Sequence, residues 1–140
     1  RSIISLLKDE KIKVFGKGNN IRNWIYVKDH VKAIEKISLN KKINHGRFNI
    51  GSLNEVRNID IAKKIIFKIK NDNKYNKYID YVDDRLGHDK KYSINSSKFR
   101  RIFNWKEIGS LDYSLNETVN WYIKNKDWLK DILKKKSKFV

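Results

Sequence analysis

A glycine-rich turn followed by one arginine is the feature of this sequence that could bind a charged ligand. Residues 16–20 read GKGNN, and glycine and asparagine tolerate the positive φ values of a tight turn. Arg22 follows the turn, and we predict a buried extended segment directly after it, at residues 24–27. The planar fork of an arginine suits a phosphate, to which it donates two parallel hydrogen bonds. A surface salt bridge of Arg22 explains the same local pattern equally well.

A second polar segment contains two neighbouring carboxylates. Asp83 and Asp84 could be metal ligands, but one histidine a few residues further on, His88, gives them little ligand support. We therefore predict no metal site. The other two histidines, His30 and His45, are interpreted as surface or partly packed side chains.

Alternating strand and helix patterns run along the chain and must position these polar residues. Short runs of strand-forming residues predict strands at residues 11–15, 48–50 and 78–82. Apolar residues at helical spacing predict helices at residues 1–9, 29–39, 59–69, 96–103 and 111–126. Asp29 and Asn58 stand where N-caps are expected, and Trp24 and Trp105 are the best core candidates. Strands interleaved with helices indicate the α/β class.

No repeat and no Gly/Ser-rich linker divides the sequence, so residues 1–140 are interpreted as one unit. The basic tail at residues 127–140 is expected to be helical in its first half and frayed afterwards. No apolar run approaches the roughly 20 residues that a membrane span needs, so no membrane partner is expected. The absence of cysteine excludes disulfides and thiolate metal sites, and it fits a cytoplasmic location.

The net charge of +17 raises nucleic acid as a partner. However, lysine supplies 26 of the 33 basic residues, and Lys, Asn and Ile together fill 62 of 140 positions. AT-rich codons encode these three amino acids, and proline, which GC-rich codons encode, is absent. We therefore favour compositional drift on solvated faces and expect no specific nucleic-acid partner. A basic nucleic-acid-binding module remains the alternative.

Three segments carry a resemblance to a known family. Residues 14–30, VFGKGNNIRNWIYVKDH, resemble the pattern (V/I)YG(K/D)GxxxRDW(L/I)YVxDH of the extended short-chain dehydrogenases. Residues 48–58, FNIGSLNEVRN, are similar to the family's YNIGGxNExxN, and residues 83–94, DDRLGHDKKYSI, to its DRPGHDRRYAID. Residues 118–122, TVNWY, match TVxWY. The loop of the DRxGHD type is typical of the dTDP-glucose 4,6-dehydratase branch.

The resemblance implies an α/β fold that forms the C-terminal substrate-binding portion of such an enzyme, with the NAD-binding Rossmann core largely absent. It also implies roles for seven residues. Lys13, Val14 and Phe15 would lie at the nucleotide base, Arg22 at the diphosphate, Asn58 at the nucleotide, and Arg85 and His88 at the second phosphate and the ribose. Leu86 stands where the family has proline, so we expect a less rigid loop.

The activity that the resemblance implies is that of a lyase. The family's enzyme uses NAD to oxidise C4 of dTDP-glucose, loses water across C5 and C6, and returns the hydride to C6, giving dTDP-4-keto-6-deoxyglucose. The GxxGxxG cradle does not occur in these 140 residues, and the spacing Tyr-x-x-x-Lys occurs only from Tyr122 to Lys126, where the chain matches TVxWY rather than the family's reactive pair. We therefore expect the chain to bind a dTDP-sugar weakly, without turnover, and to lack catalytic residues of its own.

The partners implied by the resemblance are an N-terminal Rossmann domain that binds NAD and a second copy of the whole enzyme in a homodimer. Without that domain, apolar surface is expected to be exposed around residues 1–10 and 24–37. The alternative within the same superfamily is a fragment of a UDP-sugar epimerase or decarboxylase, which would bind a uridine nucleotide instead.

Overall fold

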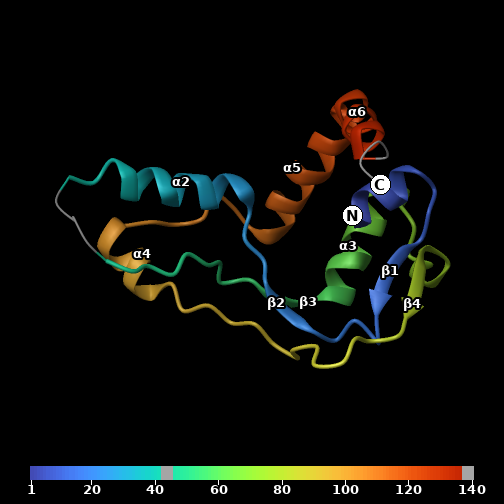
Figure 1. Cartoon of the computed structure of the whole chain (residues 1–140), viewed down its shortest axis with the longest axis horizontal. Helices are drawn as coiled ribbons and strands as arrows, with labels where there is room; N and C mark the ends of the chain where they lie inside the picture. The colour runs from blue at the N-terminus through green and yellow to red at the C-terminus, as the bar shows by residue number, and fades with distance from the viewer. Residues whose placement is uncertain (42–45, 137–140) are drawn as a thin grey trace.

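The computed structural model describes residues 1–41 and 46–136, and it describes the side chains up to residue 134. The molecule is elongated, with helices α2 and α4 at one end and α1, α3, β1 and β4 at the other (Figure 1). Strands β2 and β3 lie between the two ends, and α5 leads towards α6 near the N-terminus. Two separate clusters of buried side chains correspond to the two ends.

The larger end is built from α1 (Ser2–Leu7), β1 (Ile12–Phe15), α3 (Asn58–Lys70), β4 (Ile79–Val82) and α5 (Leu111–Lys124). Strands β1 and β4 pair in parallel. The alternation of β1 follows from its sequence, because every second side chain of a strand points to the same face. The alternation predicted for this strand is thereby confirmed.

The core of the larger end is aliphatic. Its centre is α3, whose apolar residues at helical spacing turn one stripe towards α1, β1 and α5. Helix α3 ends at Lys70, and the next residue, Asn71, has a φ of 49°, the left-handed conformation that often stops a helix. The buried side chains of this cluster are Ile3, Leu6, Ile12, Val14, Ile59, Ile61, Ala62, Ile65, Ile66, Ile79 and Val119.

The smaller end is aromatic and joins α2 (Val27–Ser38) to α4 (Ser97–Phe103). Phe99 of α4 is fully buried, with its ring centroid 4.7 Å from that of Phe103 and 5.6 Å from that of Trp105. Trp105 is 2% exposed, which confirms it as a core residue. Its indole nitrogen is buried with no hydrogen-bond partner among the described residues.

A polar clamp ties α4 to the rest of the smaller end. Arg100 donates two hydrogen bonds to the Glu107 carboxylate, at 2.9 and 2.8 Å, and a third to the backbone oxygen of Gly51 at 2.9 Å. Ser96 also donates to the Gly51 oxygen, at 2.9 Å. Glu107 in turn accepts from the backbone N–H of Leu53 at 3.1 Å. The guanidinium of Arg100 therefore holds three separate parts of the chain together.

Two short strands connect the ends. Strand β2 (Ile21–Asn23) pairs antiparallel with β3 (Glu55–Arg57), so that Arg22 lies opposite Val56. The indole N–H of Trp24 donates to the Val56 backbone oxygen at 3.2 Å, and its ring packs partly buried against the aliphatic core. The core role predicted for Trp24 is therefore confirmed.

Four local predictions were wrong. The strand predicted at residues 48–50 does not form, because Phe48 and Ile50 pack on the aromatic cluster without a neighbouring strand. The extended segment predicted at residues 24–27 is wrong at its last residue, because Tyr26 has an extended backbone and residues 24–26 are partly buried, whereas Val27 begins α2 and is 64% exposed. Strand β3 was not predicted at all.

The two predicted N-caps are the other errors. Helix α2 begins before Asp29, whose buried carboxylate accepts a hydrogen bond from the backbone N–H of Ile108 at 2.8 Å. Helix α3 begins at Asn58 itself, its N-cap is Arg57, and no side-chain cap bond forms there. In both cases a polar residue lies near a helix start without capping it, and the distant partner of Asp29 is not revealed by the local sequence.

The C-terminal helix α6 (Lys126–Lys136) confirms a helical first half of the predicted basic tail, whereas residues 137–140 lie outside the described residues. His45 lies outside them too, and His30 is exposed as predicted. The expected apolar surface is confirmed on α2, where Val31 and Ile34 are about half exposed, but not on α1, where Leu6 is buried. Within residues 1–41 and 46–136, no helix has the length and apolar character of a membrane span.

Candidate functional site

The site forms at the edge of the sheet where β1 and β4 end. Because parallel strands place their carboxyl ends at the same edge, the glycine turn after Phe15 and the loop after Val82 begin side by side. The N–H of Gly16 donates to the Val82 oxygen at 2.8 Å. Gly16 has a φ of +52°, and a Cβ added there would lie 3.1 Å from an oxygen of Asp84. The glycine thus lets the turn and the loop approach closely.

Backbone hydrogen bonds fix the loop at residues 83–92 along β2. The N–H of Ile21 donates to the Lys90 oxygen at 2.8 Å, and the N–H of Tyr92 donates to the Ile21 oxygen at 3.1 Å. The side chain of Asn20, 9% exposed, donates to the Asp89 oxygen at 3.1 Å. These contacts hold the loop within reach of the side chain of Arg22.

Arg22 is the centre of this cluster. One of its terminal nitrogens donates to the Ile21 oxygen at 2.8 Å, and the other contacts His88 Nε2 at 2.8 Å and the Asp89 oxygen at 3.0 Å. The guanidinium carbon lies 4.4 Å from the centre of the Tyr92 ring, within the range of a cation–π contact. Arg22 is therefore held between a flat aromatic face and a row of acceptors.

His88 links Arg22 to a carboxylate. Its Nδ1 lies 2.5 Å from Asp84 Oδ1, and its side chain is only 6% exposed. The hydrogen bond from His88 is the main reason why the pKa of Asp84 lies below its ordinary value, opposed by partial burial. The imidazole and the Phe15 ring are nearly perpendicular, with the centroids 6.3 Å apart.

Tyr92 carries a second carboxylate contact. Its hydroxyl donates to Asp89 Oδ2 at 2.5 Å, and this bond raises the pKa of Tyr92, with the charges of Arg22 and Arg85 acting in the opposite direction. The phenol therefore stays neutral near pH 7, with its ring against the guanidinium. The resulting cluster joins Arg22 to His88 and Tyr92, each of which bonds a carboxylate, Asp84 and Asp89 respectively.

The structure brings some of the seven predicted site residues together. Phe15, Arg22 and His88 form one contact cluster, and Arg85 lies in the same loop, exposed, with its backbone oxygen accepting from the His88 N–H at 3.2 Å. Phe15 is 47% exposed, so part of its ring is accessible to a ligand.

The other three predicted residues lie further along β1 and at the start of α3. Val14 is buried in the aliphatic core, whereas Lys13 is exposed and pairs in register with Asp80. Asn58 is joined to the cluster indirectly, since its backbone N–H donates to the Asn20 oxygen at 3.0 Å. Asn20 therefore links the start of α3 to the loop at residues 83–92.

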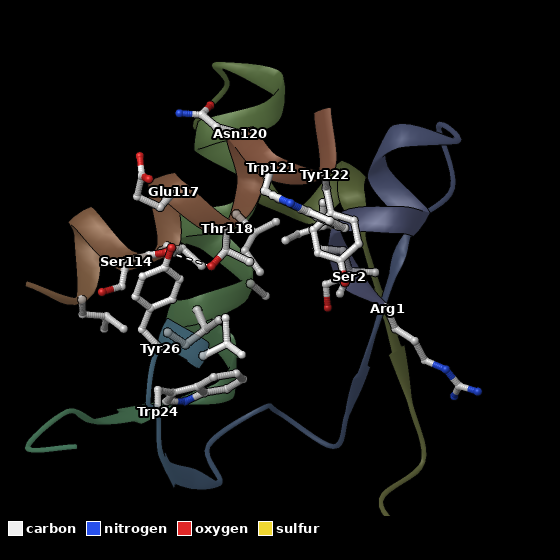
Figure 2. A pocket seen from close by; sticks show the side chains of 18 of the residues that line it. Arg1, Ser2, Trp24, Tyr26, Ser114, Glu117, Thr118, Asn120, Trp121 and Tyr122 are labelled. Atoms are coloured by element: carbon white, nitrogen blue, oxygen red, sulfur yellow. Dashed lines mark hydrogen bonds between the residues drawn. The ribbon is translucent and has the colours of Figure 1, made fainter. Parts of the chain in front are cut away.

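A cavity of about 1000 Å³ opens beside this cluster. Lys13, Phe15 and Asn58 belong to its lining, together with residues of α1 and α5. Figure 2 shows Trp24 and Tyr26 at the lower side of the cavity, with Thr118 of α5 above them. The lining is mainly apolar, with a few hydroxyl and amide groups, four basic side chains and the carboxylate of Glu117, a composition that ligand sites and domain interfaces share.

The sequence did not predict the roles of three residues in the cluster. Tyr92 and Asn20 carry no local signal for contacting Arg22 or the loop, because their partners are distant in sequence. Asp84 was considered only as a metal ligand, whereas its spacing of four residues from His88 was the available signal for an ion pair. No group of acidic and histidine residues within the described part of the chain could hold a metal ion.

The comparisons with known proteins agree with this geometry. The family model of GDP-mannose 4,6 dehydratase matches residues 2–118. The chain therefore belongs to the GDP-mannose 4,6 dehydratase family. It is 33% identical over 134 residues to the dTDP-glucose 4,6-dehydratase of Shigella flexneri, a match that covers 93% of this chain and 37% of the relative. The chain thus spans little more than a third of the curated relatives that it matches.

Solved structures of related enzymes share the fold of this chain. The dTDP-glucose 4,6-dehydratase of Bacillus anthracis, in complex with NAD, is 36% identical, with a TM-score of 0.79 over 91% of this chain and 39% of that one. The UDP-glucose 4-epimerase of Thermotoga maritima, with UDP-glucose, is 26% identical, with a TM-score of 0.75 over 88% of this chain and 38% of that one. The predicted α/β fold, corresponding to the C-terminal part of a dTDP-glucose 4,6-dehydratase, is confirmed.

Proposed function

We propose that this chain is the nucleotide-sugar-binding part of a dTDP-glucose 4,6-dehydratase, with dTDP-glucose as the ligand. The observation that carries the proposal is the position of Arg22, which is held on the Tyr92 ring beside His88 and the half-exposed ring of Phe15. A fixed guanidinium beside a partly accessible aromatic ring offers a diphosphate and a base their two main partners.

Each of the other predicted residues adds one contact to this proposal. Arg85, exposed in the loop at residues 83–92, supplies a second cation for the diphosphate, and His88 supplies a polar contact where the phosphate meets the ribose. Val14 and Lys13 present the backbone of β1 to the base. Asn58 contributes from the cavity wall, where the N-terminus of α3 favours a negative charge. These roles are proposals for all seven residues.

The activity proposed for the whole enzyme needs more than these groups. NAD binding and the Tyr–Lys pair would come from a Rossmann domain packed on this unit, and the cavity of Figure 2 is the surface that suits such a contact. We further propose that the whole enzyme is a cytoplasmic homodimer, and that residues 1–140 form one binding unit with a basic helical tail.

The binding role is tested by calorimetric titration of the chain with dTDP. Replacing Arg22 and Arg85 together by alanine should weaken binding by at least tenfold, because charge-assisted hydrogen bonds are worth about 1.5–3 kcal/mol each. Arg101→Ala is the matched control, since Arg101 is exposed on α4 at the other end of the molecule. Unchanged dTDP affinity in the double variant would refute the assignment.

The UDP-sugar alternative is favoured by the likeness to the UDP-glucose 4-epimerase, so UDP is titrated in parallel. Tighter binding of UDP than of dTDP would transfer the proposal to that class of enzyme. A titration with DNA across salt concentrations tests the nucleic-acid alternative. Non-specific attraction by the charge of +17 should vanish near physiological salt, and selective binding that survives there would contradict our proposal.

A further inference from the structure

The contacts of His88 define the position of its proton. An arginine can only donate hydrogen bonds, so the contact of 2.8 Å with Arg22 makes His88 Nε2 the acceptor. The neutral imidazole then carries its proton on Nδ1, which donates to Asp84 Oδ1 at 2.5 Å. A protonated imidazole, which donates from both nitrogens, is incompatible with the contact to Arg22.

The surroundings of His88 reinforce this arrangement. Its side chain is 6% exposed, so water has little access to Nε2 while Arg22 stays in place. The charged groups around it are Asp84 and Arg85 of its own loop and Arg22 of β2, with Asp89 beyond Arg22. Two aromatic rings lie close by: the Phe15 ring of β1 makes a perpendicular contact with the imidazole, and the Tyr92 ring lies against Arg22.

Both terminal nitrogens of Arg22 donate to protein acceptors in the free chain, and one of them makes both the contact with His88 and the bond to the Asp89 oxygen. An incoming phosphate therefore competes with the lone pair of His88 for this nitrogen. A diphosphate that takes the fork of Arg22 removes the donor from His88 Nε2. The imidazole is then left between the carboxylate of Asp84 and a phosphate oxygen, both negatively charged.

We propose that Asp84, His88 and Arg22 form a latch that a diphosphate opens with the uptake of a proton. The inference rests on the proposed function of this site. When Arg22 turns to the phosphate, His88 Nε2 takes a proton from the solvent and donates to a phosphate oxygen, while Nδ1 keeps its bond to Asp84. The proton comes from water or buffer, and no covalent bond to the ligand forms or breaks. Asp84 is a positioning residue that acts through His88.

The latch makes binding depend on pH. Binding should take up approaching one proton per ligand near neutral pH, and affinity should rise by about tenfold at most for each unit by which the pH falls. The probe is dTDP-glucose, because its diphosphate is esterified at both ends and does not titrate near neutral pH. Any proton uptake is then due to the protein.

The test is isothermal titration calorimetry of the chain with dTDP-glucose at pH 7.5, in buffers with different enthalpies of ionisation. The wild-type chain should show proton uptake, and His88→Gln and Asp84→Asn should lose it. His30→Gln is the matched control, because His30 is exposed on α2 and should leave the uptake unchanged. Binding without proton uptake, or equal uptake in His88→Gln, would overturn the latch.

A second measurement needs no ligand and separates this inference from the proposed function. In ¹⁵N NMR spectra of the free chain, His88 should be in the neutral Nδ1–H form, and Asp84→Asn should shift it towards the Nε2–H form. An Nε2–H tautomer in the wild-type chain would overturn the latch. If dTDP-glucose does not bind, the proposed function fails, while the NMR spectrum still decides whether Asp84 and Arg22 fix the imidazole.

Discussion

The clamp between Arg100 and Glu107 should make the aromatic end of the molecule sensitive to acid. Two hydrogen bonds from Arg100 lower the pKa of Glu107 from its ordinary value of 4.5 to about 2, opposed by partial burial. A carboxylate with a lowered pKa stabilises the folded chain above pH 4.5, and this contribution is lost as the pH falls towards 2.

The size of the effect follows from the shift. Each pKa unit corresponds to about 1.4 kcal/mol, so the shift sets an upper limit of roughly 3 kcal/mol. The two side chains are 18% and 16% exposed, so solvent screens the pair only in part, and the cost of removing both charges from water offsets some of the gain; we expect about 1–2 kcal/mol. For a chain of 140 residues, that corresponds to a fall in Tm of roughly 5 °C.

The assay is urea unfolding of wild type and Glu107→Gln, followed by circular dichroism at several pH values between 6 and 2.5. At pH 6 the variant should be less stable, because Arg100 then lacks its charged partner. The difference should shrink as the pH falls through the window in which Glu107 takes up its proton. Glu35→Gln, on the exposed side of α2, is the control. Parallel loss of stability in wild type and Glu107→Gln would refute the reasoning.

Three further substitutions test the packing. Gly18→Ala should cost about 2–4 kcal/mol in urea unfolding, because φ is +68° and a Cβ would lie 2.7 Å from Val14. Phe99→Ala should cost about 3–5 kcal/mol because Phe99 is fully buried, whereas Phe67→Ala, at a site that is 47% exposed, should cost far less in the same assay. Ser96→Ala should lower Tm by an amount equivalent to about 1–2 kcal/mol, since its hydroxyl bonds both Gly51 and Arg100; an unchanged Tm would contradict that role.

Local pattern was sufficient for most of the secondary structure. The apolar spacing of α3 and the alternation of β1 predicted both elements, because each buries one face and the period of that face is set by helix or strand geometry. The pattern failed at residues 48–50, where aromatic and β-branched residues are buried without forming a strand. A buried irregular segment and a buried strand have the same sequence pattern. Only the presence of a pairing strand distinguishes the two.

The features of the candidate site also fall into those that the sequence predicts and those that only the tertiary structure shows. The sequence by itself determined the family resemblance, the glycine turn at residues 16–20 and the choice of Arg22, because these depend on residue types at fixed spacings. Only the tertiary structure decided that Tyr92 lies against Arg22, that His88 accepts from it, and that Asp29 caps no helix but bonds Ile108. Each of these contacts joins residues more than 60 positions apart, and such pairings are fixed by the packing of whole elements rather than by the local chain.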